Sequence, residues 1–210
     1  MTFDQASYDV RFEWGERGVT TLAPVSSVLV IVDVMSFSTC VTVAAGRGAT
    51  VYPYQWRDYS SADFARSIGA EIAGSRGSSG YSLSPASLTS IPAGTPLVLP
   101  SPNGSSLTLL AGATAVWAGC LRNARAVADA AARVLGPIAV IGAGERWKDD
   151  GSLRPAYEDL IGAGAIISRL PGRRSPEAQM TVDAFEAARP TLLSSGMGQL
   201  DLRSFVRCAA

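Results

Sequence analysis

The sequence predicts one α/β domain with a mixed, largely parallel central sheet flanked by helices. Apolar runs alternate with helical stretches along the chain, as in folds that join parallel strands through helices. Two of these runs, VLVIVDV at 28–34 and IAVI at 138–141, are rich in β-branched residues and are typical of strands buried on both faces. With 210 residues, the chain is long enough for one well-packed domain, and we assign residues 1–210 to it.

The expected strands are short apolar runs bounded by glycine, proline or polar residues. They cover residues 8–14, 28–34, 50–54, 96–99, 114–118 and 138–141. Expected helices cover residues 36–45, 61–70, 105–110, 123–135, 155–169 and 176–188, followed by a short C-terminal helical tail. The clearest helix, 123–135, is closed by Gly136-Pro137, a common stop signal.

Composition excludes several classes of partner and location. The 18 basic and 18 acidic side chains cancel, so no basic surface for nucleic acid or anionic lipid is expected. No window approaches the roughly 18 apolar residues of a membrane span, and the N-terminus lacks signal-peptide features. Three well-separated cysteines indicate free thiols in a reducing compartment. We therefore expect a cytoplasmic protein that binds a small molecule, with a homodimer as the working expectation for its assembly.

The absence of histidine restricts the chemistry most. It excludes Ser-His-Asp and Cys-His catalysis, phosphohistidine intermediates and metal sites that depend on imidazole. Catalysis would have to use carboxylates, hydroxyls, Lys or Arg and backbone groups. A metal in that setting would have oxygen ligands, and Mg²⁺ is the leading choice.

Ligands of open α/β sheets collect beyond the carboxyl ends of the strands, and the first candidate there is Asp33. It ends an otherwise apolar strand, where an unpaired charge is costly. It is therefore either part of a site or, with Ser36 and Ser38, a cap for the following helix.

Two further strand ends carry polar residues. The PSPNGSS segment at 100–106 combines an Asn-Gly turn with a hydroxyl-rich helix start, which can bind an anion or be an ordinary turn. The GAGERW segment at 142–147 offers Glu145 as a metal ligand or base and Arg146 as an anion clamp. Glu158 and Asp159 fall in the first turn of the next helix. They either interact with its dipole, or one of them faces the strand ends.

Several familiar phosphate-binding motifs are missing. Asp33 is followed by Val34-Met35, which excludes the Asp-x-Asp motif of haloacid-dehalogenase phosphatases. No cysteine is followed by five residues and an arginine, as tyrosine-phosphatase chemistry requires. The P-loop and GxGxxG signatures are also absent.

The chain resembles the 2-phosphosulfolactate phosphatase family in a set of segments that occur in the same order along the sequence. The segments are VIVDVMSFSTCVTVAAGRGA, GSRG, SLSPASL, LPSPNGSSL and IGAGERWKDDGSLRPAYEDLIGAGAII, which cover most of residues 8–168. The resemblance implies an α/β fold and Mg²⁺-dependent hydrolysis of a phosphomonoester, 2-phosphosulfolactate, on the route to coenzyme M.

The resemblance also implies site residues. Catalytic roles fall to Asp33, Glu145 and Glu158, and the expected metal ligands are Asp33, Glu145 and Asp159. The residues expected to bind phosphate or a neighbouring anion are Ser36, Ser38, Arg76, Asn103, Gly104, Ser105 and Arg146.

The chain departs from the family pattern at three serines. Ser36 and Ser106 stand where the family commonly has arginine, and Ser75 where it has glutamate. Losing two guanidinium groups weakens the case for a substrate that carries phosphate, sulfonate and carboxylate. A less anionic phosphomonoester is the corresponding expectation. Two other functions stay open: a non-catalytic small-anion binding protein, and another carboxylate-dependent or metal-dependent enzyme such as a lyase.

Overall fold

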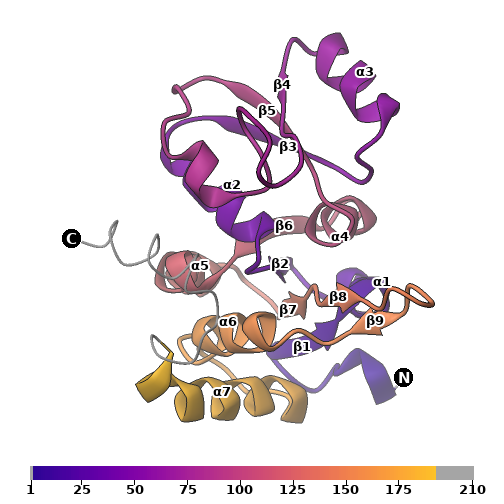
Figure 1. Cartoon of the computed structure of the whole chain (residues 1–210). Helices are drawn as coiled ribbons and strands as arrows, with labels where there is room; N and C mark the ends of the chain where they lie inside the picture. Colours follow the sequence, from indigo (N-terminus) through magenta and orange to yellow (C-terminus); the bar gives the residue numbers. More distant parts are fainter. Residues whose placement is uncertain (1, 193–210) are drawn as a thin grey trace.

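The computed structural model describes residues 2–192 and confirms an α/β fold with parallel sheets flanked by helices (Figure 1). The described strands are β1 (Val10–Trp14), β2 (Val28–Val32), β3 (Thr50–Tyr54), β4 (Glu71–Ile72), β5 (Pro96–Pro100), β6 (Ala115–Gly119), β7 (Ile138–Gly142), β8 (Glu145–Arg146) and β9 (Leu153–Arg154). The α-helices are α1 (Gly15–Leu22), α2 (Phe37–Gly46), α3 (Tyr59–Ser67), α4 (Gly104–Leu110), α5 (Ala124–Ala131), α6 (Tyr157–Ile167) and α7 (Pro176–Ala188).

The strands divide between two parallel sheets, whereas the sequence had predicted one central sheet. The larger sheet has the order β1-β7-β2-β6, the smaller has the order β3-β5-β4, and β8 and β9 form a separate antiparallel hairpin. Figure 1 shows the smaller sheet, with α2 and α3, above the larger one. The division follows from chain order, because β3, β4 and β5 are contributed by one continuous stretch between β2 and β6.

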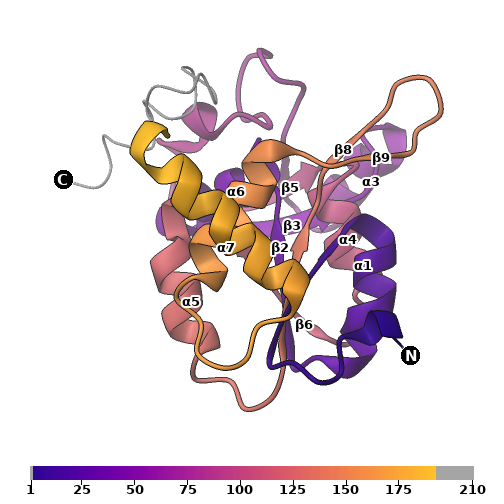
Figure 2. The same ribbon diagram turned by 90° about the horizontal axis from the view of Figure 1, so that it is seen from below.

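The larger sheet is covered on both faces, as its apolar strands predict. All residues of β2 and β7 are buried. Alternate β2 side chains point to opposite faces: Val30 packs in the cluster formed with α5 and α6, and Leu29 in the cluster formed with α1 and α4. Helix α7 lies beside α6 (Figure 2) and contacts the edge strand β1 directly, so α6 and α7 together cover this side of the larger sheet.

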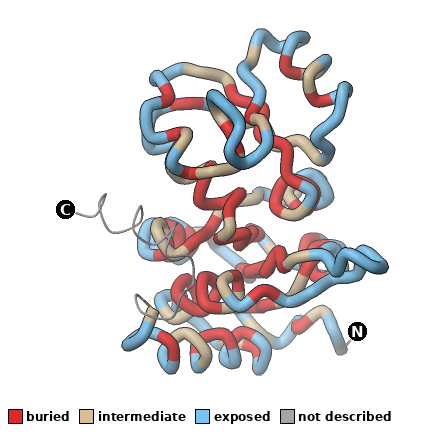
Figure 3. The backbone as a smooth tube through the Cα atoms, viewed as in Figure 1, coloured by how far each residue is buried: buried red, intermediate tan, exposed pale blue. Residues whose placement is uncertain are grey.

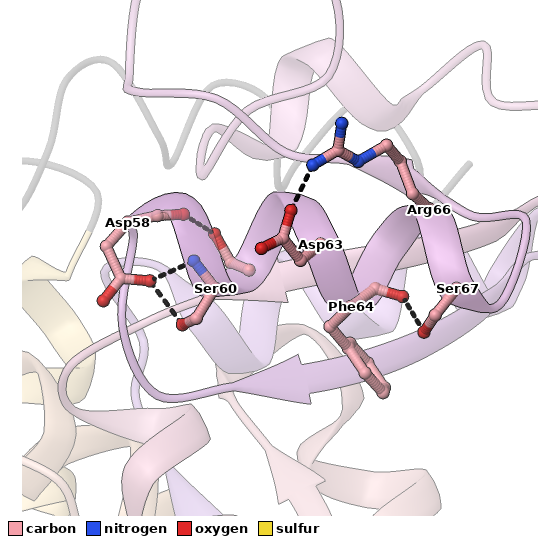
Figure 4. A network of polar contacts seen from close by, with 7 residues as sticks. Asp58, Ser60, Asp63, Phe64, Arg66 and Ser67 are labelled. Atoms are coloured by element: carbon pink, nitrogen blue, oxygen red, sulfur yellow. Dashed lines mark hydrogen bonds and ion pairs between the residues drawn. The ribbon is translucent and has the colours of Figure 1, made fainter.

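The smaller sheet has its own core. Phe37 and Cys40 of α2 pack against Leu97 and Leu99 of β5. Helix α3 follows β3, and its Phe64 ring stacks on Tyr54 of that strand. The Asp58 side chain accepts a hydrogen bond from the Ser60 backbone N–H and so caps α3 (Figure 4). In Figure 3, buried chain runs through both sheets and through the segments that join them.

The element predictions are largely confirmed. The ranges of β3 and α7 are the same as predicted, and the ends of the other predicted strands shift by at most two residues. Sequence patterns missed α1, the two-residue strand β4 and the β8–β9 hairpin, and the expected helix 123–135 is shorter, as α5. The expected C-terminal tail lies outside the described residues. Within residues 2–192, no helix combines the length and the hydrophobicity that a membrane span requires.

Candidate functional site

Asp33 lies directly after β2, where the two sheets meet. Its side chain is buried, and both carboxylate oxygens accept backbone hydrogen bonds: Oδ1 from the Phe37 N–H (3.0 Å) and Oδ2 from the Gly104 N–H (2.9 Å). Phe37 begins α2 and Gly104 begins α4, so one carboxylate joins the start of two helices. Asp33 thus accepts the first N–H of α2, as the capping interpretation expected, whereas Ser36, the N-cap residue, makes no side-chain cap bond. The same contacts place Asp33 at the junction of the sheets.

Asp159 is the second buried carboxylate, and it comes from the first turn of α6. Its Oδ1 accepts a 2.7 Å hydrogen bond from the Val34 N–H, and its Oδ2 accepts a 2.8 Å bond from the Gly144 N–H. Glu158, the neighbouring acid, is only partly buried. The prediction that one of these adjacent acids faces the strand ends is confirmed, and the residue is Asp159.

The environment raises the pKa of both buried acids. Burial raises the pKa of Asp33 to about 6. The hydrogen bonds from the N–H groups of Phe37 and Gly104 act to lower this pKa, and the charges of Glu145 and Glu158 act to raise it. Burial and then the charge of Asp33 raise the pKa of Asp159 well above its ordinary value. Acidic side chains are thus concentrated where the ends of β2 and β7 and the starts of α2, α4 and α6 converge, and burial disfavours their charged forms.

Asn103 and Glu145 extend the acidic site. The Asn103 side chain, just before α4, donates a 3.1 Å hydrogen bond from Nδ2 to Glu145 Oε2. Both side chains are partly exposed, in contrast to Asp33 and Asp159. The structure therefore brings together the acids expected from the sequence, with two of them buried and Glu145 and Glu158 more accessible.

Three predicted serines contact backbone groups of the turns that surround the site. Ser38 Oγ donates to the Ile31 carbonyl (2.9 Å) and accepts from the Asp33 N–H (3.1 Å). Ser105 Oγ donates to the Leu99 carbonyl (2.8 Å). Ser36 Oγ donates to the Leu83 carbonyl (2.7 Å). These bonds fix the turns after β2 and β5.

Two arginines approach the site from the smaller sheet. The exposed Arg76 donates a 3.2 Å hydrogen bond from Nη2 to Ser36 Oγ. Arg57 donates to Ser75 Oγ (3.4 Å) and to the Pro100 carbonyl (3.5 Å), close to the turn that carries Asn103. Sequence reasoning missed Arg57. Its position soon after β3, at another strand end, was the signal that could have found it.

Arg146, predicted to bind an anion, has partners within the chain. It forms an ion pair with Glu16 of α1 and donates a 3.3 Å hydrogen bond to the Gly151 carbonyl. The side chains of Arg146 and Glu16 are 45% and 53% exposed. The contacts of Arg146 thus connect the β8–β9 hairpin to α1.

The donor set suits Mg²⁺, although residues 2–192 contain no preformed group of three acidic or cysteine side chains arranged to hold a metal. Mg²⁺ usually keeps several waters and needs only one or two carboxylates together with substrate phosphate. Each oxygen of Asp33 and Asp159 accepts one backbone hydrogen bond, so it has a second lone pair available. A divalent cation would also offset the repulsion from neighbouring acids that, after burial, adds to the rise in their pKa values.

The fold and this site define an α/β protein with a buried acidic pair at the carboxyl ends of its strands. A family model described as 2-phosphosulpholactate phosphatase matches residues 19–197. The chain therefore belongs to the 2-phosphosulpholactate phosphatase family. A comparison with curated protein sequences gave no match. The family is one of phosphatases, so it indicates a hydrolase that acts on a small-molecule substrate.

Proposed function

We propose that the chain is a Mg²⁺-dependent hydrolase of a small-molecule phosphomonoester. The observation that supports the proposal is the pair of buried carboxylates, Asp33 and Asp159, which lie beside the more accessible Glu145 and Glu158. A site for anion binding alone would gain nothing from such a concentration of negative charge. A site that holds a divalent cation and a phosphate would use it.

In this proposal, Asp33, Glu145 and Asp159 hold the metal ion. When bound, the ion would offset negative charge on the phosphate and on the departing oxygen. The backbone N–H groups of Phe37, Val34, Gly104 and Gly144 hold the two buried carboxylates in fixed positions, so little reorganisation is needed when a ligand binds.

The partly buried acids, Glu145 and Glu158, lie where they can contact the attacking water. One oxygen of Glu145 is engaged by Asn103, and Glu158 lies close enough to Asp33 to affect its pKa. We assign Glu158 as the base that takes a proton from the attacking water. The water oxygen forms a bond to phosphorus, the bond from phosphorus to the ester oxygen breaks, and the proton passes to that oxygen. The products are an alcohol and inorganic phosphate.

Arg57, Arg76 and Asn103 would hold the phosphate oxygens. Both guanidinium groups lie at contacts with the turns around the acidic site, and each has N–H groups beyond those already donated. We also propose a cytoplasmic location. This proposal is supported by the three well-separated cysteines of the sequence, which contain no CxxC pair.

The decisive experiment is phosphate release from 2-phosphosulfolactate and from a panel of other phosphomonoesters, with Mg²⁺ and with EDTA. We expect release that needs Mg²⁺ and that Asp33→Asn abolishes while the variant stays folded. Asp129→Asn, an exposed change on α5, is the matched control and should keep full activity. Full activity of Asp33→Asn would contradict the proposal. Binding without release, or release of a product other than phosphate, would support the anion-binding or lyase alternatives.

A further inference from the structure

A cavity of about 450 Å³ lies beside the acidic site, between β1, α1, the start of α4 and the β8–β9 hairpin. Asn103 and Glu145 belong to the acidic site and also line this cavity, so the two are continuous. A volume of this size is within the range of small-molecule sites. The cavity therefore offers room for whatever is attached to a phosphate held at the acidic site.

The hairpin wall of the cavity is fastened to α1. Leu153 of β9 lies against Gly15 and Gly144, where an added Cβ would come within 3.3 Å and 2.7 Å of its Cδ1 atom. The ion pair of Arg146 with Glu16 holds the same hairpin to the same helix. These contacts give the cavity a defined shape on the side away from Asn103.

The charges that line this cavity away from the acidic site cancel. They are the carboxylates of Glu13 and Glu16 and the guanidinium groups of Arg17 and Arg146. Arg146 is neutralised by Glu16, and Arg17 is exposed to solvent. Leu107, Ala143 and Leu153 add apolar surface. An anionic group here would leave water beside the carboxylates of Glu13 and Glu16, and Arg17 would offer it only a solvent-screened charge at the surface.

We propose that this cavity binds the organic group of the substrate, and that this group is uncharged. The substrate is then a phosphomonoester with no second anionic group, such as the phosphate of a polyol or of an aryl alcohol. The inference rests on the proposed phosphatase function, which it makes more specific. The serines at positions 36 and 106 are in keeping with it, since neither supplies a positive charge.

The first test compares esters on the wild-type protein. Values of kcat/KM are measured with Mg²⁺ for glycerol 2-phosphate and 4-nitrophenyl phosphate, which have neutral organic groups, and for 3-phosphoglycerate and 2-phosphosulfolactate, which do not. We expect the neutral esters to be preferred by about ten-fold or more, as for one charged group buried without a partner. Preference for the carboxylated or sulfonated esters would overturn the inference.

The second test breaks the ion pair between Arg146 and Glu16 in the wall of the cavity. Glu16→Gln frees Arg146 and should raise kcat/KM for the anionic esters relative to the neutral ones, by about two-fold to five-fold because the pair is half exposed. Glu177→Gln removes one exposed carboxylate from α7, away from the cavity, and should change neither class. Equal effects of the two variants on this ratio would overturn the assignment of the cavity.

Binding separates this inference from the proposed function. Phosphonate analogues of a neutral and a sulfonated ester are titrated into the wild-type protein by calorimetry, which needs no turnover. Tighter binding of the neutral analogue supports the cavity assignment, and tighter binding of the sulfonated analogue overturns it. Failure to release phosphate from every ester would overturn the proposed hydrolase function alone, because the calorimetric order would still decide the cavity's preference.

Discussion

Asp159 accepts a 2.7 Å hydrogen bond from the backbone N–H of Val34, the residue directly after Asp33. This bond spans 125 positions of the chain and fixes the start of α6 to the end of β2. With the bond from Gly144 to the same carboxylate, it also ties in the segment after β7. The two buried acids are thus positioned by one shared turn, so a substitution at either should alter the position of the other.

Asp159→Asn should destabilise the fold. An asparagine keeps one acceptor oxygen but turns an NH₂ group toward the N–H of Val34 or of Gly144, so one buried donor loses its acceptor. We expect a decrease of about 1–3 kcal/mol in the free energy of unfolding, measured with urea. The exposed Asp129→Asn should cost less than about 0.5 kcal/mol. Equal costs for the two variants would show that the Asp159 contacts do not stabilise the fold.

The raised pKa of Asp33 predicts that stability falls as pH rises toward 6. An aspartate in the unfolded chain titrates near 3.8 and the folded one near 6, so the folded state binds more protons between these values. The contribution of Asp33 to the free energy of unfolding therefore decreases by at most about 3 kcal/mol between these two pH values. Above pH 6 this contribution stays constant.

Urea unfolding between pH 4.5 and 7.5 in EDTA, on wild type and Asp33→Asn, isolates this contribution. Other carboxylates, such as the exposed Asp58, have a lowered pKa and act in the opposite direction. The difference between the two proteins cancels the contribution of unaffected carboxylates such as Asp58. Asp159, whose pKa is raised in part by the charge of Asp33, adds to the difference in the same direction. We expect wild type to lose stability relative to the variant as pH rises. A constant difference would contradict the assigned environment of Asp33.

Much of the fold followed from hydrophobic patterning. The buried strands β2 and β7 were evident because both faces are covered, and α7 was evident from Pro176 and its helical spacing. The division into two sheets was not, because strand pairing depends on long-range contacts that no local pattern encodes. The hairpin strands β8 and β9 have two residues each, too few for a periodic signal.

The acidic site was predictable in composition but not in contacts. A carboxylate at the end of an apolar strand pointed to Asp33, and two adjacent acids at a helix start pointed to Glu158 and Asp159 without distinguishing between them. No pattern could show that Arg146 pairs with Glu16, since 130 positions separate them. Arg57 was missed for a similar reason, because its contact with the Pro100 carbonyl forms only when β3 and β5 pair.

Gly104→Ala should disrupt the acidic site from the backbone. A Cβ at this position would lie 2.3 Å from the Phe37 ring and 2.8 Å from Asp33 Oδ2. The clash would displace the N–H that Asp33 accepts, so we expect a loss of about 1–3 kcal/mol in unfolding free energy and of phosphatase activity. Gly46→Ala is the control, because nothing lies within 4 Å of its added Cβ at the end of α2. An active, fully stable Gly104→Ala protein would show that this N–H contact is dispensable.

Arg57→Ala and Arg76→Ala test whether the smaller sheet supplies the phosphate clamp. Each guanidinium can add charge-assisted hydrogen bonds to a phosphate held next to Asn103, so each change should raise KM and weaken inhibition by inorganic phosphate by about ten-fold. Stability should change little, because Arg76 is exposed and both arginines make only long contacts of 3.2–3.5 Å.

Arg66→Ala is the matched control for these two arginines. It also removes a guanidinium from the smaller-sheet part of the protein, but that group is paired with Asp63 on the exposed surface of α3 (Figure 4). Its KM should stay at the wild-type value. If Arg57→Ala leaves phosphate inhibition unchanged while Arg76→Ala weakens it, Arg57 only braces the turn at Pro100. If neither variant differs from Arg66→Ala, the phosphate is held by the larger sheet alone, and the strand ends of the smaller sheet have no part in binding it.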